Sequence, residues 1–164
     1  MNKKTTVETG TESGSRFFFI DESGDPNFLG KGKKDLLSSD SASLWFMVGY
    51  LELEDQKNLS RRFMEIRKEI AGDEYINRIP SVQHSLRCFH ANKDCREVQE
   101  RVFKVLKQED FRFHTVVIQK RIDQFLSKFH GKKSELYSYM VERLLEKRLH
   151  LYPNIDIYFA NWIR

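Results

Sequence analysis

The sequence predicts an α/β fold, because segments typical of strands and of amphipathic helices alternate along its 164 residues. Four short apolar or β-branched runs have the length and composition of strands, at residues 17–20, 44–53, 111–118 and 155–159. Three longer segments carry apolar residues at helical spacing, at 55–72, 94–106 and 136–149. Helices separate the later strands, so we expect a mixed sheet flanked by helices, with parallel crossovers in the later part of the chain.

Length and composition are typical of one soluble globular domain, which we expect over residues 16–164. Residues 1–15 contain almost nothing to bury and are expected to form a disordered arm. The 28 Lys and Arg against 24 Asp and Glu leave a net charge of +4, which favours a polyanionic partner only weakly. No apolar run approaches the length of about 18 residues that a membrane-spanning helix needs, so no membrane partner is expected.

Cysteine usage favours a reducing, cytoplasmic setting. Cys88 and Cys95 are the only cysteines, and the first fifteen residues lack the apolar core of a secretory signal. His84 and His90 lie close to them in the sequence, yet the spacing matches no common zinc module. Ordinary reduced thiols are therefore favoured over a zinc site.

The first half of the chain predicts two strands and a helix. Four consecutive apolar residues at 17–20 are typical of a central strand that is buried on both faces. The turn-forming residues at 23–27 end it, and a polar excursion over 29–42 leads to the second strand at 44–53, which we expect to pair with the first. Asp55 is expected to cap a helix that ends near Gly72.

The second half predicts two more helices and two more strands, whereas no element is predicted over 73–87, which contains Pro80. Asp94 and Glu97 have the spacing of a capping box for the second helix. The alternating run at 111–118 predicts a strand, and the long amphipathic helix follows Gly131. Pro153 then separates that helix from the last strand.

Two adjacent carboxylates, Asp21 and Glu22, follow the first strand, where a charge is costly unless it is paired or bound to a metal. Because successive strand residues alternate, their side chains point to opposite faces, and Asp21 shares its face with Phe17 and Phe19. One interpretation is a metal site. The other is a simple turn, since turn-forming residues dominate 21–27, and the pattern alone favours the turn.

The chain resembles the bacterial domain-of-unknown-function family numbered 3800, whose members open on Ile-Asp-Glu-Ser-Gly. The resemblance runs from about Arg16 to the end of the chain, through the segments FFFIDESGDPNF, LWFMVGYLEL, FHANKDCREVQERVFKVL, FRFHTVVIQKR and LYSYMVERLLEKR. It implies a ribonuclease H-like fold, in which a central strand carries the first carboxylate of a two-metal site. It also implies a nuclease that uses Mg²⁺ or Mn²⁺ to hydrolyse the phosphodiester of RNA or DNA.

The resemblance also implies the site residues. Asp21 becomes the principal metal ligand, with Glu22 beside it and Asp25 as a weaker candidate. His90, in a recurring His-Ala step, would orient phosphate or water, and Lys120 would contact the scissile phosphate. Judged from the residues alone, a lone His before a helix is more often a surface or capping residue, and a Lys at a strand end is more often solvated.

The sequence departs from the family pattern at its C-terminus. Family members continue past the strand matching 155–159 into helices that carry a late carboxylate in a Gln-x-x-Asp-like segment, whereas this sequence stops at Arg164. We therefore expect an incomplete, truncated domain, in which the second half of the two-metal site is missing unless Glu52, Glu54 or Asp156 substitutes for the late carboxylate. The alternative to a nuclease is a non-catalytic nucleic-acid-binding or protein-interaction module of the same fold. A second copy or a partner protein is expected to cover the apolar faces of the last strand.

Basic residues gather between 119 and 133, namely Lys120, Arg121, Lys128, Lys132 and Lys133. Asp123 is the only acidic residue in this segment, and Phe125 and Phe129 are interleaved with the cations. The pattern fits a loop that follows the phosphates of a nucleic acid. It fits equally a solvated loop whose two Phe, four positions apart, pack on the core.

Overall fold

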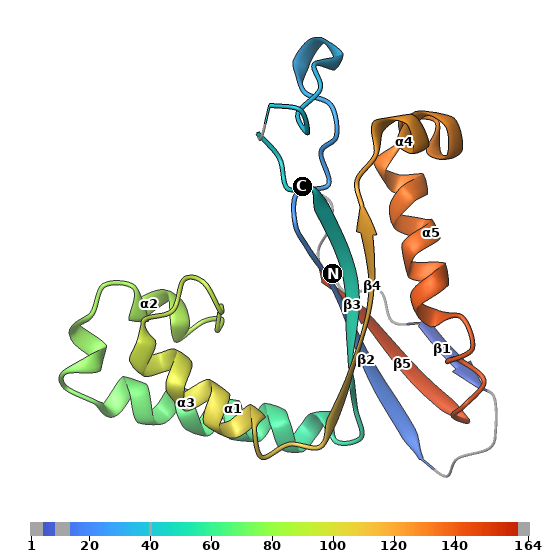
Figure 1. Ribbon diagram of the computed structural model, residues 1–164. Coiled ribbons are helices and arrows are strands. Elements are labelled where there is room, and N and C mark those ends of the chain that lie inside the picture. Colours follow the sequence, from blue (N-terminus) through green and yellow to red (C-terminus); the bar gives the residue numbers. More distant parts are fainter. Residues whose placement is uncertain (1–4, 9–13, 40, 161–164) are drawn as a thin grey trace. The chain divides into compact units, whose positions relative to one another are not determined.

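The computed structural model describes residues 5–8, 14–39 and 41–160 (Figure 1). They form two units, one from the described residues of Met1–Glu54 and Phe111–Arg164, and the other from Asp55–Asp110. The helices of 55–110 bury their apolar faces in a cluster of their own. The expectation of a single domain over 16–164 stays a prediction.

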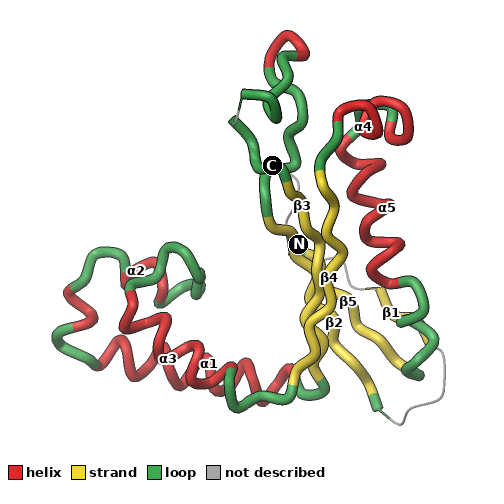
Figure 2. The backbone as a smooth tube through the Cα atoms, in the orientation of Figure 1, coloured by secondary structure: helices red, strands yellow, loops and turns green. Residues whose placement is uncertain are grey.

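A five-stranded mixed sheet in the order β1-β5-β2-β3-β4 forms the first unit (Figure 2). Its strands are β1 (Thr5–Glu8), β2 (Ser15–Ser23), β3 (Trp45–Leu53), β4 (Phe111–Gln119) and β5 (Asn154–Phe159). The β2, β3 and β4 strands are consecutive antiparallel neighbours, and β5 lies parallel to β2 on its other side. The predicted α/β class is confirmed, with a mixed sheet against which helices pack.

The β1 strand differs from the disordered arm that was expected over residues 1–15. Thr5–Glu8 pair antiparallel with β5, from Thr5 opposite Ile157 to Glu8 opposite Asn154. β-branched Thr and Val suit a strand, and the pairing satisfies backbone groups of β5 that an open edge would leave exposed. The rest of the expected arm, at 1–4 and 9–13, lies outside the described residues.

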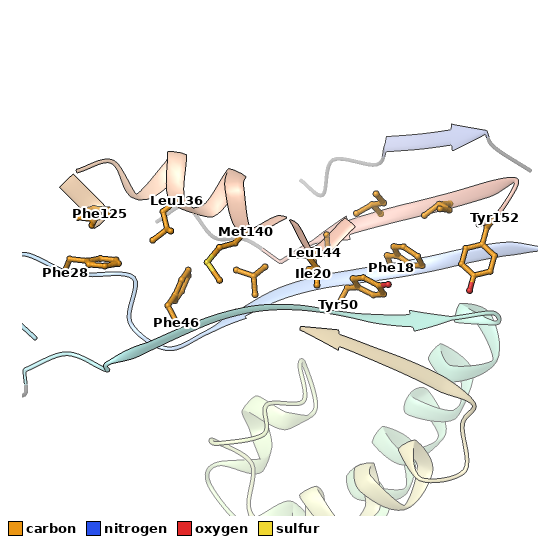
Figure 3. Packing of buried hydrophobic residues seen from close by; sticks show 13 residues of the cluster. Phe18, Ile20, Phe28, Phe46, Tyr50, Phe125, Leu136, Met140, Leu144 and Tyr152 are labelled. Atoms are coloured by element: carbon orange, nitrogen blue, oxygen red, sulfur yellow. The ribbon is translucent and has the colours of Figure 1, made fainter. Parts of the chain in front are cut away.

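Helix α5 (Lys133–Leu145) covers one face of the sheet, and α4 (Ile122–Phe129) packs beside it. Figure 3 shows side chains of α5 meeting those of the strands, where the core forms. Phe18 and Ile20 point into this core, whereas Phe17 and Phe19 on the opposite face are only half-buried. The expectation that the first strand is buried on both faces is therefore wrong, because α4 and α5 cover the same face.

The second unit contains α1 (Gln56–Gly72), the short helices η2 (Ile76–Arg78) and α2 (Val82–Ser85), and α3 (Arg96–Leu106). The predicted cap of α1 is confirmed, since the Asp55 carboxylate accepts a hydrogen bond from the Asn58 amide at 2.9 Å. The capping box at Asp94 is wrong. The buried Asp94 carboxylate instead accepts from the Ser85 hydroxyl at 2.7 Å and from the His90 amide at 2.6 Å.

The long β2–β3 connection contains one further short helix, η1 (Lys31–Lys33), and a bridge between Leu29 and Asp35. Across the described part of the chain, no helix has both the length and the apolar character needed to cross a membrane.

Candidate functional site

Four of the predicted site residues meet at one end of the sheet in the first unit. The β2 strand ends where β3 begins and where β4 ends, as the pairing of Ser23 with Met47 and of Met47 with Val117 requires. The β5 strand ends at the same place, with the Ala160 amide donating to the Ile20 carbonyl at 2.9 Å. Asp21, Glu22, Asp25 and Lys120 therefore gather at this end, although they come from segments about a hundred residues apart.

Asp21 and Glu22 lie on opposite faces of β2, as the sequence predicted. Asp21 is exposed on the face away from α5, opposite Gly49 in the register, and its Oδ1 accepts from the Glu22 amide at 2.9 Å. Glu22 is partly buried on the α5 face, and its Oε2 has no hydrogen-bond partner among the described residues. Burial, and then the charge of Asp21, raise the pKa of the Glu22 carboxyl above its usual value.

Tyr137 of α5 is close enough to Glu22 and Asp21 for their charges to affect its pKa. Burial raises the pKa of Tyr137 to about 12, and the negative charges of Glu22 and Asp21 add to the rise. The phenol is therefore neutral at physiological pH. The α5 face of the site thus contains the neutral phenol of Tyr137 and the carboxylate of Glu22, whose Oε2 has no hydrogen-bond partner among the described residues.

Lys120 holds the loop that follows the acidic pair. Its side chain is only 4% exposed, and its Nζ donates to the carbonyl oxygens of Asp25 at 2.9 Å and of Asn27 at 2.6 Å. The ammonium also lies 5.1 Å from the ring centroid of Phe28. Burial lowers the pKa of Lys120, and the charge of Asp25 opposes the shift. This burial differs from the solvated lysine that the residues alone favoured, because a buried ammonium needs nearby acceptors, whereas contact with a scissile phosphate stays a prediction.

Asp25 is engaged within the same loop. Its Oδ1 accepts from the amide nitrogen of Asn27 at 2.8 Å and from that residue's side-chain amide. Lys133, at the start of α5, donates to the side-chain oxygen of the same Asn27. The carboxylate of Asp25 therefore shapes the loop, and the lysines at 120 and 133 fasten the loop to β4 and α5.

The acidic pair meets only part of what a divalent ion needs. Carboxylate oxygens are the ligands that Mg²⁺ and Mn²⁺ prefer, and the unpartnered Oε2 of Glu22 beside the charge of Asp21 suits a cation. Within the described residues, however, no three His, Cys, Asp or Glu side chains are close enough together to hold a metal. Because Asp21 and Glu22 lie on opposite faces of β2, only one of them can bind a given ion directly, and the described residues do not assemble the two-ion site that was expected.

The three carboxylates considered as substitutes lie toward the other end of the sheet. Glu52 is opposite Phe18, three residues before Asp21 and thus about 10 Å away along the strand. Its buried carboxylate accepts from the Tyr152 hydroxyl and lies 3.5 Å from Nε of Arg16. Glu54 forms an ion pair with the same arginine, and Asp156 is opposite Phe17. None of them reaches Asp21.

His90 belongs to the second unit. Its backbone amide donates to Asp94, and its Nδ1 accepts from the Asn92 amide at 3.2 Å, so the exposed imidazole organises the turn before α3. Cys88 and Cys95 in the same unit are both free thiols. A catalytic role for His90 stays a prediction.

The basic segment forms a helix, α4, where the sequence suggested a loop. Phe125 is buried and stacks on Phe28 with ring centroids 4.1 Å apart, and Phe129 packs on Tyr139 at 5.4 Å. Both Phe thus pack on the core, as the second interpretation of the segment predicted. Apolar residues at 122, 125, 126 and 129 have helical spacing, which is the signal that the sequence analysis missed.

The cations of this segment differ in their partners. Arg121 pairs with Asp123 at 3.0 Å, and Lys132 pairs with Glu135 at 2.8 Å. Lys128 is exposed and has no ion pair or hydrogen bond with any described residue. Of these cations, Lys128 is thus the most available for an anionic ligand, and nucleic-acid contact by the segment stays a prediction.

A pocket of about 370 Å³ lies at this end of the first unit, between α4, α5 and the end of β4. It is lined by Phe28, Ile118, Gln119, Arg121, Gln124, Phe125, Lys128, Phe129, Leu136 and Tyr139. Sequence reasoning did not predict this pocket, because its walls come from four separate segments.

Comparisons of the chain with protein-family models, with curated proteins and with solved structures each found no match.

Proposed function

We propose that this chain carries a divalent-metal-dependent nuclease site, which hydrolyses the phosphodiester of a nucleic acid and is centred on Asp21 and Glu22. One observation carries the proposal. The two carboxylates are adjacent at the end of the central strand β2, and the partly buried oxygen of Glu22 has no hydrogen-bond partner among the described residues. Such a group is costly unless a cation or donor compensates it.

The ribonuclease H-like identity is part of this proposal. It is supported by the Ile-Asp-Glu-Ser-Gly signature at 20–24 and by the position of Asp21 on a central strand of a mixed sheet. In the fold that the resemblance implies, the first metal-binding carboxylate has this position. The proposed resemblance of the chain to the family numbered 3800 rests on the same signature.

The roles of the residues follow from their positions. The exposed Asp21 would hold Mg²⁺ or Mn²⁺, with Glu22 adding negative charge from the α5 face. When bound, such an ion activates water and stabilises the leaving oxygen of a phosphodiester. Lys120 keeps the loop at 25–27 in place beside the acidic pair, through its two carbonyl contacts. Lys128 would attract the phosphates of the substrate through its charge.

A non-catalytic nucleic-acid-binding module is the second candidate. It is favoured by one observation, namely that no group of three potential metal ligands occurs among the described residues. An exposed cation beside a partly aromatic pocket suits nucleic-acid binding without requiring hydrolysis. The two candidates differ in what they require of Asp21.

The test compares the parent chain with Asp21→Asn and with Glu142→Gln, which changes an exposed carboxylate on α5. Calorimetric titration measures Mn²⁺ binding, and labelled RNA and DNA report Mg²⁺-dependent cleavage against an EDTA control. We expect Asp21→Asn to lose both activities without a change in thermal unfolding, and Glu142→Gln to keep both. Nucleic-acid binding without cleavage in the parent would favour the second candidate. Cleavage by Asp21→Asn at the parental rate would overturn the site assignment.

A further inference from the structure

The pocket beside α4 has an aromatic interior and an exposed aromatic residue at its lining. Phe28 and Phe125 are stacked and buried, and they line the pocket together with the buried Leu136. Tyr139 is 40% exposed and packs with Phe129. The volume of about 370 Å³ is at the small end of the roughly 300 to 1,000 Å³ that ligand sites span. This lining suits one flat ring system.

The polar lining of the pocket suits an anionic group attached to that ring. Lys128 is exposed and lacks a described partner, while Arg121 is partly neutralised by Asp123. The amide of Gln124, which is also exposed, offers both a donor and an acceptor. The carboxylate in contact with Arg121 points to a ligand of low charge, such as one phosphate, rather than to a polyphosphate.

The pocket also lies at the same end of the sheet as the acidic pair. Phe28 in its wall directly follows the loop that Lys120 fastens, and this loop begins after Glu22. Ile118, also in the wall, is opposite Phe46 near the start of β3, where β2 ends. At this end of the sheet the pocket and Glu22 lie on the face that α5 covers, whereas Asp21 is exposed on the opposite face.

We propose that this pocket holds a single nucleotide of an unpaired nucleic-acid strand, with its base against Tyr139 and its phosphate at Lys128. The inference takes nucleic acid as the ligand class from the proposed function, on which it rests. It adds that the site prefers single strands to duplexes. A base can enter such a pocket only after leaving the stack of a duplex. Stacking on an aromatic residue tolerates any base, because every base has an aromatic face.

The test measures binding in EDTA, so that it does not depend on cleavage. Fluorescence anisotropy follows a labelled single strand of about eight nucleotides, a duplex of the same length, and competition by free nucleoside monophosphates. We expect the single strand to bind more tightly than the duplex, and free nucleotides to compete only weakly. Tighter binding of the duplex, or binding of free nucleotides without binding of the strand, would overturn the inference.

Two variants test the residues, each with a matched control. Tyr139→Ala should weaken binding of the single strand roughly five- to a hundredfold, whereas Tyr139→Phe, which keeps the ring, should bind like the parent. Lys128→Glu should weaken binding and lower the salt dependence by about 0.7 for each lost phosphate contact. Lys147→Glu makes the same charge change on an exposed residue after the far end of α5 and should have little effect.

The outcomes separate this inference from the proposed function. Loss of cleavage in Asp21→Asn with unchanged binding of the single strand supports both. Binding by the parent without any cleavage leaves the pocket assignment standing and overturns the nuclease. Cleavage that is unaffected by Tyr139→Ala and Lys128→Glu, with unchanged affinity, overturns the pocket assignment alone. Binding of an acidic peptide that depends on Lys128, in place of the oligonucleotide, would also overturn it.

Discussion

Glu22 provides the sharpest test of the site, because its charge is expected to destabilise the free protein. Its Oε2 is buried without a hydrogen-bond partner among the described residues, and its pKa is raised by burial and by Asp21. An unsatisfied buried polar group costs about 1 to 3 kcal/mol and more when it is charged, so an unpaired amide at this position recovers only the part of the cost that is due to the charge. Replacing the carboxylate by the neutral amide in Glu22→Gln removes the charge while keeping the shape. We therefore expect the variant to be more stable than the parent at pH 7 by about 1 kcal/mol, which corresponds to a few degrees in thermal midpoint.

The pH dependence follows from the direction of the shift. The folded state has the higher pKa, so it binds more protons than the unfolded state between the ordinary Glu value of 4.5 and the raised value. Stability of the parent therefore falls as the pH rises through this window, and the contribution is constant above it. Below the unfolded pKa, Glu22 is protonated in both states. The advantage of Glu22→Gln should then disappear.

The assay is urea unfolding in EDTA at about pH 4 and pH 7. Glu142→Gln serves as the control, since its exposed carboxylate should change stability by less than about 0.5 kcal/mol. When Mn²⁺ replaces EDTA in the buffer, it should stabilise the parent by mass action and leave Asp21→Asn unchanged. A loss of stability in Glu22→Gln at pH 7, or a gain of equal size at both pH values, would refute this account of the carboxylate.

Three further outcomes are expected. Lys120→Met should cost about 2 to 4 kcal/mol in urea unfolding, because it leaves the carbonyls of Asp25 and Asn27 without their charged donor; parental stability would assign Lys120 no role in holding the loop. Burial lowers the pKa of His114, so the folded protein binds fewer protons at this residue than the unfolded chain does, and the free energy of unfolding should fall as the pH drops below 6.5. A His114→Gln variant whose urea unfolding has the same pH profile as the parent would contradict this. Phe113 is 63% exposed on the face of β4 away from α5 and should promote self-association. Light scattering at tens of micromolar should therefore show an oligomer whose population falls in Phe113→Lys, and a monomeric parent would contradict this prediction.

Local sequence patterns correctly predicted those helices and strands that are marked by residues only a few positions apart. Alternating β-branched residues at 111–118 correspond to β4 (Phe111–Gln119), and the spacing after Asp55 corresponds to α1 (Gln56–Gly72), including its cap. These predictions succeed because strand alternation and helix capping depend on neighbours within a few positions. The prediction for the segment of α4 (Ile122–Phe129) was wrong for a different reason. The charged residues of this segment suggested a loop, although its apolar residues have helical spacing.

The sequence by itself determined that an apolar run leads into Asp21 and Glu22 and that their side chains face opposite ways, since alternation along a strand requires only the adjacent backbone. Tertiary structure decided what surrounds them. Lys120 is adjacent to the loop at 25–27 because β4 ends where β2 ends, and that register depends on the pairing of strands many residues apart. The pocket beside α4 and the separate core of Asp55–Asp110 arise in the same way, from side chains that only long-range packing brings together.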